Sequence, residues 1–247
     1  MQRRWLQQSL QLQQEHLSRD GAGLYSYEAA VAHLVKRGLP EHHVRSGSMP
    51  EPSLRQCGEA IAEHFDRAEP LTILHVGNFV GVSLSWFADY TRDWNGKSRV
   101  VGVDPNVTHR GIERPQDHVV SLLTTFGFET AVMLVAGYTL HKNAGDLDRG
   151  DPRGSFARDQ SCECALPMLA DLAPGSFDVA VMDGNHESDY LRAELVAIRR
   201  LLRSGGLLVL DDVFDWGTLA LIPQELEASP DATLIARDNR LGIWQLG

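Results

Sequence analysis

From residue 71 onward, short apolar runs alternate with longer amphipathic segments. The apolar runs end in Gly or Asp, and they cover residues 71–77, 99–104, 131–137, 177–184 and 206–212. The segments between them carry apolar residues at helical spacing, most clearly in 187–206. Strands that alternate with helices in this way build βαβ units and a parallel sheet covered by helices on both faces. The pattern therefore predicts a Rossmann-like, doubly wound α/β domain over residues 71–247.

The end of the chain breaks this alternation. The sequence ATLIARDNRLGIWQLG contains two strand-like runs separated by the turn residues Asp238 and Asn239. Two strands joined by so short a connection form an antiparallel hairpin. Together with the five earlier runs, the hairpin predicts a seven-stranded, mostly parallel sheet that closes with an antiparallel pair.

Residues 1–70 have a helical character instead, and we expect a helical extension there. Apolar residues at helical spacing indicate helices over 27–36 and 54–67, and Ser53 is the expected N-cap of the second. An earlier glutamine-rich stretch carries an apolar stripe made of Leu6, Leu10 and Leu17. This extension is expected to contact the substrate or another subunit.

A long polar segment, residues 139–164, interrupts the predicted domain between a strand and the next helix. Loops of this length in a compact domain are usually functional or disordered. Two interpretations stay open, a lid over the substrate and a mobile insertion.

The charge and composition of the chain exclude several classes of protein. A net charge of −10 argues against a general affinity for nucleic acid or for an anionic membrane. The run AVMLVAGY is far too short to span a bilayer, and glutamines interrupt the N-terminal stretch where a signal peptide would be apolar. Cys57, Cys162 and Cys164 lack zinc-site spacing and indicate reduced thiols. We expect a cytoplasmic protein.

A glycine-containing turn follows the first apolar run. In HVGNFVGVS the run ends at Gly77, and Gly81 and Ser83 lead into a helix. Ligands of open α/β sheets bind beyond the carboxyl ends of the strands, where glycine lets the backbone come close. Phe79 stands where the dinucleotide fingerprint has its second glycine, so the turn departs from that motif. Tight packing between strand and helix would explain the glycines without a ligand.

Asp104 ends the second apolar run. A carboxylate at that position can accept both hydrogen bonds from the diol of a ribose. It could also simply begin a turn before Pro105. Taken with the glycine turn, Asp104 indicates a ligand that carries adenosine, without saying which one.

Three more acids follow the fourth and fifth runs. Asp183 ends one run, and Asp211 with Asp212 ends the next. If the two strands are neighbours, the three carboxylates meet at one edge and repel unless a cation lies among them. Oxygen ligands suit Mg²⁺, Ca²⁺ or Mn²⁺. The alternative is local, with Asp212 capping the next helix and Asp183 accepting from turn amides.

His186 comes shortly after Asp183. An imidazole has a pKa close to working pH, so next to a metal-bound hydroxyl it is a candidate general base. A histidine at the start of a helix can also be only a cap or a surface residue. His75 lies inside a predicted strand, and we expect it in the core.

Four motifs together resemble the class I S-adenosylmethionine (SAM)-dependent methyltransferases. They are VGNFVGVS, GVDPN, MDGNHESDY and LLRSGGLLVLDDV, and the resemblance covers about residues 71–247. More narrowly, they resemble the metal-dependent O-methyltransferases of catechols and natural-product sugars. The chain departs from these enzymes in having His186 where the catechol enzymes carry a lysine, and SGG where PGG is usual.

The resemblance implies a role for each of these residues. It implies that SAM is the cofactor and that Mg²⁺ or another divalent ion binds Asp183, Asp211 and Asp212, with His186 as the base. It also implies a small-molecule hydroxyl acceptor, a sugar or a polyphenol, and a homo-oligomer. The residues implied to surround SAM are Gly77, Asn78, Gly81, Ser83, Asp104 at the ribose, Tyr138 near the adenine, and Asp183.

Two other functions compete with this one. A nicotinamide-dependent oxidoreductase would share the glycine turn and the acid after the second strand, but the altered fingerprint and the three carboxylates speak against it. A methyltransferase-like protein that binds its ligand without catalysis is the second, and a complete set of acids argues against it.

Overall fold

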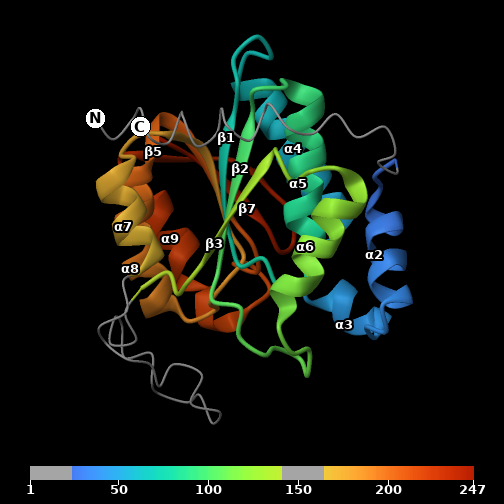
Figure 1. The fold of residues 1–247 in the computed structure, drawn as a ribbon. Coiled ribbons are helices and arrows are strands. Elements are labelled where there is room, and N and C mark those ends of the chain that lie inside the picture. Colours follow the sequence, from blue (N-terminus) through green and yellow to red (C-terminus); the bar gives the residue numbers. More distant parts are fainter. Residues whose placement is uncertain (1–23, 141–163) are drawn as a thin grey trace.

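The computed structural model describes residues 24–140 and 164–247, and Figure 1 shows their arrangement around one sheet. The stripe of Leu6, Leu10 and Leu17 and nearly all of the 139–164 insertion lie outside the described residues. The strands are β1 (Thr72–Val76), β2 (Arg99–Asp104), β3 (Val132–Ala136), β4 (Phe177–Met182), β5 (Leu202–Leu210), β6 (Ala232–Arg237) and β7 (Gly242–Leu246).

The seven strands form a single mixed sheet in the order β3-β2-β1-β4-β5-β7-β6. Strands β1 to β5 are parallel, and β7 runs antiparallel to both β5 and β6. The predicted doubly wound sheet with its closing hairpin is therefore confirmed. The chain order reverses at β1, which pairs with β2 on one side and β4 on the other. Such a switch point is where open α/β sheets bind their ligands.

Helices cover both faces of the sheet (Figure 1). One face is covered by α2, α4, α5 and α6, and the other by α7, α8 and α9. The helices are α2 (Tyr27–Lys36), α3 (Glu41–Ser46), α4 (Glu51–His64), α5 (Val82–Trp94), α6 (Pro115–Phe126), α7 (Ala165–Leu172), α8 (Ser188–Leu201) and α9 (Leu221–Glu227), with a short 3₁₀ helix at Gly217–Leu219.

Two predicted boundaries in the helical elements are corrected. Helix α4 begins at Glu51 and ends at His64, whereas the sequence predicted 54–67 with Ser53 as cap. Pro52 favours this earlier start, because a proline in the first turn has a suitable φ and needs no hydrogen bond. Ser53 instead lies within the helix, where its hydroxyl donates to Asp238 at 2.7 Å. Helix α2 matches its prediction, and the Ser26 side chain caps it.

Strand β5 begins earlier than predicted. It starts at Leu202, directly after α8 ends at Leu201, so Gly205 and Gly206, at the end of the predicted helical segment 187–206, lie within the strand instead. Gly205 has a φ of +75°, a left-handed conformation that a β-branched residue would not adopt easily.

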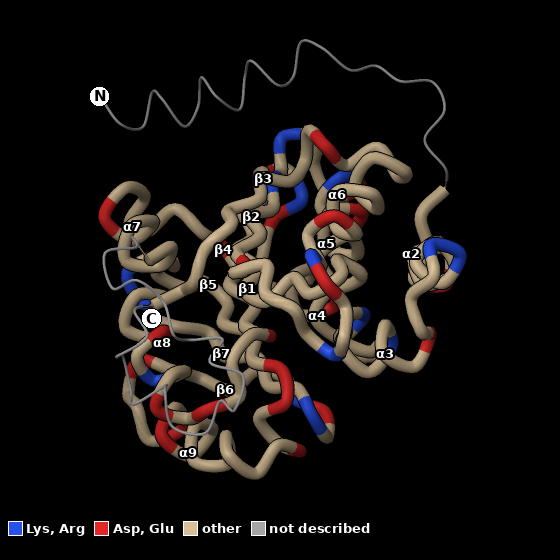
Figure 2. The backbone as a smooth tube through the Cα atoms, turned by 60° about the horizontal axis from the view of Figure 1, so that its bottom comes forward, with Lys and Arg blue, Asp and Glu red and all other residues tan. Residues whose placement is uncertain are grey.

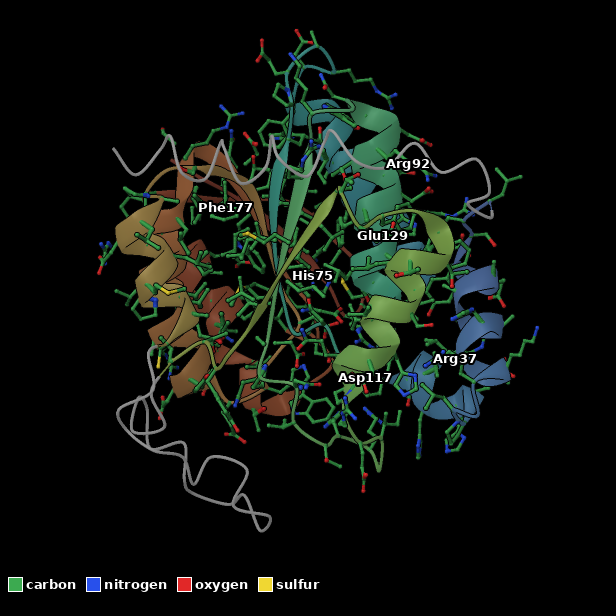
Figure 3. The ribbon with its side chains drawn as sticks, in the orientation of Figure 1. Arg37, His75, Arg92, Asp117, Glu129 and Phe177 are labelled. Carbon is green, nitrogen blue, oxygen red and sulfur yellow. The ribbon has the colours of Figure 1, made fainter. Side chains whose placement is uncertain are left out.

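The side chains of β1 show how the two faces of the core are divided. Ile73 faces the cluster under α4, α5 and α6, while Leu74 and Val76 face the opposite cluster. His75 points the same way as Ile73, is fully buried at the centre of the sheet (Figure 3), and lies 5.7 Å from the Phe87 ring. Burial lowers the pKa of His75 to about 4, so its ring is neutral. The expected core position of His75 is confirmed.

The surface charges have no common face. Figure 2 shows Lys and Arg interspersed with Asp and Glu along the described chain, rather than gathered into one basic patch. Among the described residues, every helix is too short or too polar to cross a bilayer.

Candidate functional site

The register of the sheet brings the polar strand ends together. Val76 of β1 pairs with Met182 of β4, and Met182 pairs with Leu210 of β5. Gly77, Asp183 and Asp211, the residues that directly follow these strands, therefore lie side by side. Strands β4 and β5 are neighbours, as the prediction of a shared acidic edge requires.

Close approach of two backbones accounts for the glycine at position 77. Gly77 has a φ of +86°, and a Cβ there would lie 1.9 Å from the carbonyl oxygen of Asp183. Gly81 precedes α5 with a φ of +94°, and its Cβ would lie 3.1 Å from the Cα of Val119. Packing alone is therefore enough to require glycine at both positions. This is the alternative to ligand approach that the sequence left open. A contact of either glycine with SAM stays a prediction.

Asp104 is bound to the glycine turn. Its Oδ2 accepts from the backbone N–H groups of Asn78 at 2.8 Å and Phe79 at 3.1 Å, and its Oδ1 accepts from Asn106 at 2.7 Å. Burial raises the pKa of Asp104 and outweighs these hydrogen bonds, which lower it. The carboxylate lies at the switch point beside β1, and its predicted contact with a ribose remains a prediction.

The other residues of the predicted cofactor site lie around the same edge. Ser83, in the first turn of α5, accepts a hydrogen bond from the backbone N–H of Met49 at 3.0 Å. The Asn78 side chain lies against Gly102 of β2, where a Cβ would come within 2.9 Å of it. Tyr138 follows β3 and is buried.

Three polar side chains meet between the ends of β4 and β5. Asp183, His186 and Asp212 each offer one ligand atom within 4.8 Å of the others. The distance from His186 Nε2 to Asp212 Oδ2 is 2.9 Å. Asp212 has a φ of +59°, a strained conformation of the kind that clusters at functional sites. Asp212 does not cap α9, whose N-cap residue is Ala220.

Asp211 has a different partner. Its Oδ1 accepts from Arg240 Nε at 2.8 Å and its Oδ2 from Arg240 Nη2 at 2.5 Å. The same Nε lies 2.8 Å from Asp212 Oδ1. The sheet explains this contact, because Leu210 of β5 pairs with Gly242 of β7 and the same register two residues further sets Arg240 opposite Asp212.

The three carboxylates differ in their electrostatic surroundings. Burial, then the charge of Asp211, raises the pKa of Asp183 well above its ordinary value. Burial also raises the pKa of Asp211, against the opposing effect of Arg240. Burial acts to raise the pKa of Asp212 too, but the hydrogen bond with His186 and the charge of Arg240 outweigh it, and that pKa is lowered.

Sequence reasoning missed two residues of this site. Arg240 could have been found from the predicted hairpin, because the residue just before the last strand must lie near the end of β5 if β7 pairs with it. Trp216 gave no signal, since it lies in an irregular connection. Its ring stacks on His186 with centroids 4.9 Å apart and an angle of 29°, and its side chain is 46% exposed.

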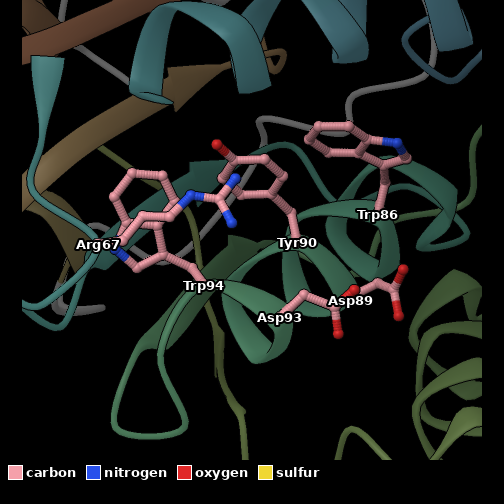
Figure 4. A pocket seen from close by; sticks show the side chains of 6 residues that line it. All are labelled: Arg67, Trp86, Asp89, Tyr90, Asp93 and Trp94. Carbon is pink, nitrogen blue, oxygen red and sulfur yellow. The ribbon is translucent and has the colours of Figure 1, made fainter. Parts of the chain in front are cut away.

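A separate pocket of about 260 Å³ lies along α5, and Arg67 from the connection after α4 also lines it (Figure 4). None of the predicted site residues lines it. Its lining residues are Arg67, Trp86, Asp89, Tyr90, Asp93 and Trp94.

A sheet of this order, with its polar residues at the carboxyl ends of β1, β2, β4 and β5, defines a class I SAM-dependent methyltransferase. A family model described as a methyltransferase domain matches residues 74–213, more than half of the chain. The chain therefore belongs to this methyltransferase family. No curated protein sequence matches it.

Solved structures share the fold over nearly the whole chain. A Staphylococcus aureus protein assigned as a caffeoyl-CoA O-methyltransferase is 16% identical with a TM-score of 0.61, over 99% of this chain and 98% of that one. The SAH-bound methyltransferase PaMTH1 of Podospora anserina is 14% identical with a TM-score of 0.59, over 92% and 91%. The O-methyltransferase TomG of Streptomyces achromogenes, involved in tomaymycin synthesis and in complex with SAM, is 19% identical with a TM-score of 0.55, over 99% and 98%. The fold is that of SAM-dependent O-methyltransferases.

Proposed function

We propose that this protein transfers the methyl group of SAM to a hydroxyl of a small molecule, with the help of a divalent cation. The acceptor is proposed to be a natural-product sugar or a polyphenol. The observation that carries the proposal is the meeting of Asp183, His186 and Asp212 at the carboxyl edge of the sheet, directly beside the glycine turn after β1. Cofactor and acceptor would then share one edge.

The residues present fit a divalent ion. Two ligands of one ion, each about 2.0 to 2.5 Å away, are separated by at most about 5 Å. The ligand atoms of Asp183, His186 and Asp212 lie within 4.8 Å of one another, so Asp183 and Asp212 can bind one ion with His186 at its side. Asp211, the remaining predicted ligand, would join only through oxygens that Arg240 now contacts. A bound divalent ion lowers the pKa of a coordinated hydroxyl.

His186 is the proposed proton acceptor. Its Nε2 lies 2.9 Å from Asp212 Oδ2, a contact that would keep the imidazole at the acidic edge. A ring nitrogen of this imidazole would take the proton of the acceptor hydroxyl. Trp216 stacks on the imidazole and restricts its orientation. The main contribution of the protein is alignment of the hydroxyl oxygen with the methyl group of SAM, because proximity and orientation account for much of such a barrier.

The exposed Trp216 ring supports a planar or ring-shaped acceptor. It offers an apolar face beside the proposed base, and such faces stack on aromatic rings or on the C–H face of a sugar. Basic residues are interspersed with acidic ones along the described chain (Figure 2), so nothing in the described residues favours nucleic acid as a substrate.

Two further parts of the proposal concern the setting of the enzyme. Cys57 is a free, buried thiol, which supports a reducing compartment such as the cytoplasm. Residues 1–70 are proposed as the extension that contacts the acceptor or a second subunit. Within it, α2 packs on α5 and α6, next to the domain that starts at residue 71.

Binding of the two cofactors can be tested separately from turnover. Thermal shift with S-adenosylhomocysteine should raise the melting temperature, while NAD should not, because only a ligand that binds the native state stabilises it. A methyl-transfer assay over a panel of sugars and polyphenols should then find an acceptor, and EDTA should stop turnover. Stabilisation by NAD and not by S-adenosylhomocysteine would contradict the proposed transfer of a methyl group from SAM. Stabilisation by S-adenosylhomocysteine with no transfer to any hydroxyl would make it a non-catalytic binder.

A further inference from the structure

Arg240 brings a permanent positive charge into the acidic site. Its side chain is 23% exposed, and it contacts Asp211, whose side chain is fully buried, through two nitrogen atoms. The same guanidinium reaches Asp212 at 2.8 Å. Paired contacts between a guanidinium and a carboxylate are among the strongest hydrogen bonds in proteins, and an arginine stays protonated at any working pH.

The side chain of Asp238 holds the turn that carries Arg240. Asp238 Oδ1 accepts from the N–H groups of Arg240 at 2.7 Å and Leu241 at 2.6 Å. Its other oxygen accepts from Ser53 of α4 at 2.7 Å. The turn that carries Arg240 is therefore fastened to itself and to a helix on the face of the sheet, so the guanidinium is tethered beside the carboxylates.

The carboxylate oxygens of Asp211 and Asp212 already have partners within the chain. Arg240 takes both oxygens of Asp211 and one oxygen of Asp212, and His186 faces the other oxygen of Asp212. A divalent ion at Asp183 and Asp212 would lie close to the guanidinium and would be repelled by it. The charge that the acidic edge needs is thus partly supplied by the chain itself.

We propose that Arg240 is a tethered cation that competes with the divalent ion for Asp211 and Asp212 and thereby weakens metal binding. This role rests on the proposed metal dependence of the enzyme. Arg240 acts as a positioning residue: without the ion it stabilises the carboxylates, and with the ion it gives up its contact with Asp212. Arg110 is a further positive charge near Asp212, and it lowers the pKa of Asp212 less than Arg240 does.

The test is a titration of the full-length protein with Mn²⁺, in which the electron paramagnetic resonance signal of free Mn²⁺ gives the dissociation constant. Arg240→Gln should bind Mn²⁺ at least about tenfold more tightly than the wild type, since loss of one nearby positive charge removes a repulsion of this order. Its melting temperature without metal should fall, because buried carboxylates lose their partner. Arg237→Gln is the matched control, as Arg237 lies over the Phe214 ring instead. It should bind Mn²⁺ like the wild type.

Tighter binding separates competition from structural damage, because a damaged site would bind Mn²⁺ more weakly. Arg240→Lys keeps the charge without the paired contact and should give an intermediate constant, which also covers the case that Arg240→Gln fails to fold. An unchanged or weaker affinity in Arg240→Gln, with Arg240→Lys no tighter than the wild type, overturns the proposal. If neither wild type nor variant binds Mn²⁺, competition and metal dependence both fail. Binding of S-adenosylhomocysteine then still tests the methyltransferase function on its own.

Discussion

Glu194 makes the stability of this protein depend on pH through a buried hydrogen-bonded chain. Its side chain, on α8, is only 1% exposed and accepts a hydrogen bond from the Thr139 hydroxyl. That hydroxyl lies 2.5 Å from the Tyr190 hydroxyl, which accepts from the backbone N–H of Leu140 at 3.3 Å. Burial raises the pKa of Glu194 from 4.5 to about 8, against the hydrogen bond from Thr139, which lowers it.

The direction in which stability changes with pH follows from the protons bound to the folded and the unfolded chain. Between pH 4.5 and about 8, the folded protein holds a proton on Glu194 that the unfolded chain has released. The contribution of Glu194 is therefore fully present below pH 4.5 and is lost as the pH rises through about 8. At about 1.4 kcal/mol for each pKa unit, the loss amounts to roughly 5 kcal/mol above the folded-state pKa.

The perturbation is Glu194→Gln, which resembles the protonated acid and keeps an acceptor for Thr139. Urea unfolding at about pH 5 should give similar free energies for variant and wild type. At about pH 9 the variant should be more stable by up to about 5 kcal/mol, because the wild type must bury a charge. Glu59→Gln, at an exposed position of α4, is the control and should change neither value. Equal pH dependence in wild type and Glu194→Gln would refute the reasoning.

Three further predictions concern the site. Gly77→Ala should lower the free energy of unfolding by about 3 kcal/mol or more, because the new Cβ would collide with the Asp183 carbonyl and because the φ at this position is positive. Gly96→Ala, at a position with open space around it, is the control in the same urea titration. Asp183→Asn should abolish Mn²⁺ binding and methyl transfer, yet calorimetry should still detect S-adenosylhomocysteine, and normal turnover would exclude the metal role. His186→Ala should lower the rate by about 10² to 10⁴ and flatten its profile between about pH 6 and 9. A variant that keeps its rate but loses Mn²⁺ would make His186 a ligand instead of a base.

The fold could be predicted because its signals are local and repeated. The parallel strands appear as apolar runs, of which β1, β2 and β4 are largely buried on both faces, and the chain leaves the sheet at a polar or glycine residue. Asp104 ends one strand of the parallel set, and Asp183 and Asp211 directly follow two others, so their common edge could be predicted from the fold class. The register between β4 and β5 then brings Asp183 beside Asp211, which was expected only on the condition that these strands are neighbours.

The remaining features depend on contacts between distant segments, which periodicity does not encode. The start of α4 is set by Pro52 in the first turn, whereas Ser53 looked like a cap in the sequence alone and instead bonds to Asp238 in the far hairpin. Trp216 reaches His186 from an irregular connection. The sequence left open whether the glycines of the β1 turn serve ligand approach or packing, and the structure shows that Gly77 is already required by its packing on Asp183.

The antiparallel hairpin connects the closure of the sheet with the charge of the site. A parallel strand next to β5 would begin at the opposite edge, and the residue before it would be remote from Asp211 and Asp212. Because β7 runs the other way, its preceding turn lies at the carboxyl edge, and the register sets Arg240 against these acids. Three carboxylates on adjacent strand ends would otherwise repel strongly in the absence of an ion. The direction of one strand thus lets the chain itself bring a positive charge to the acidic edge.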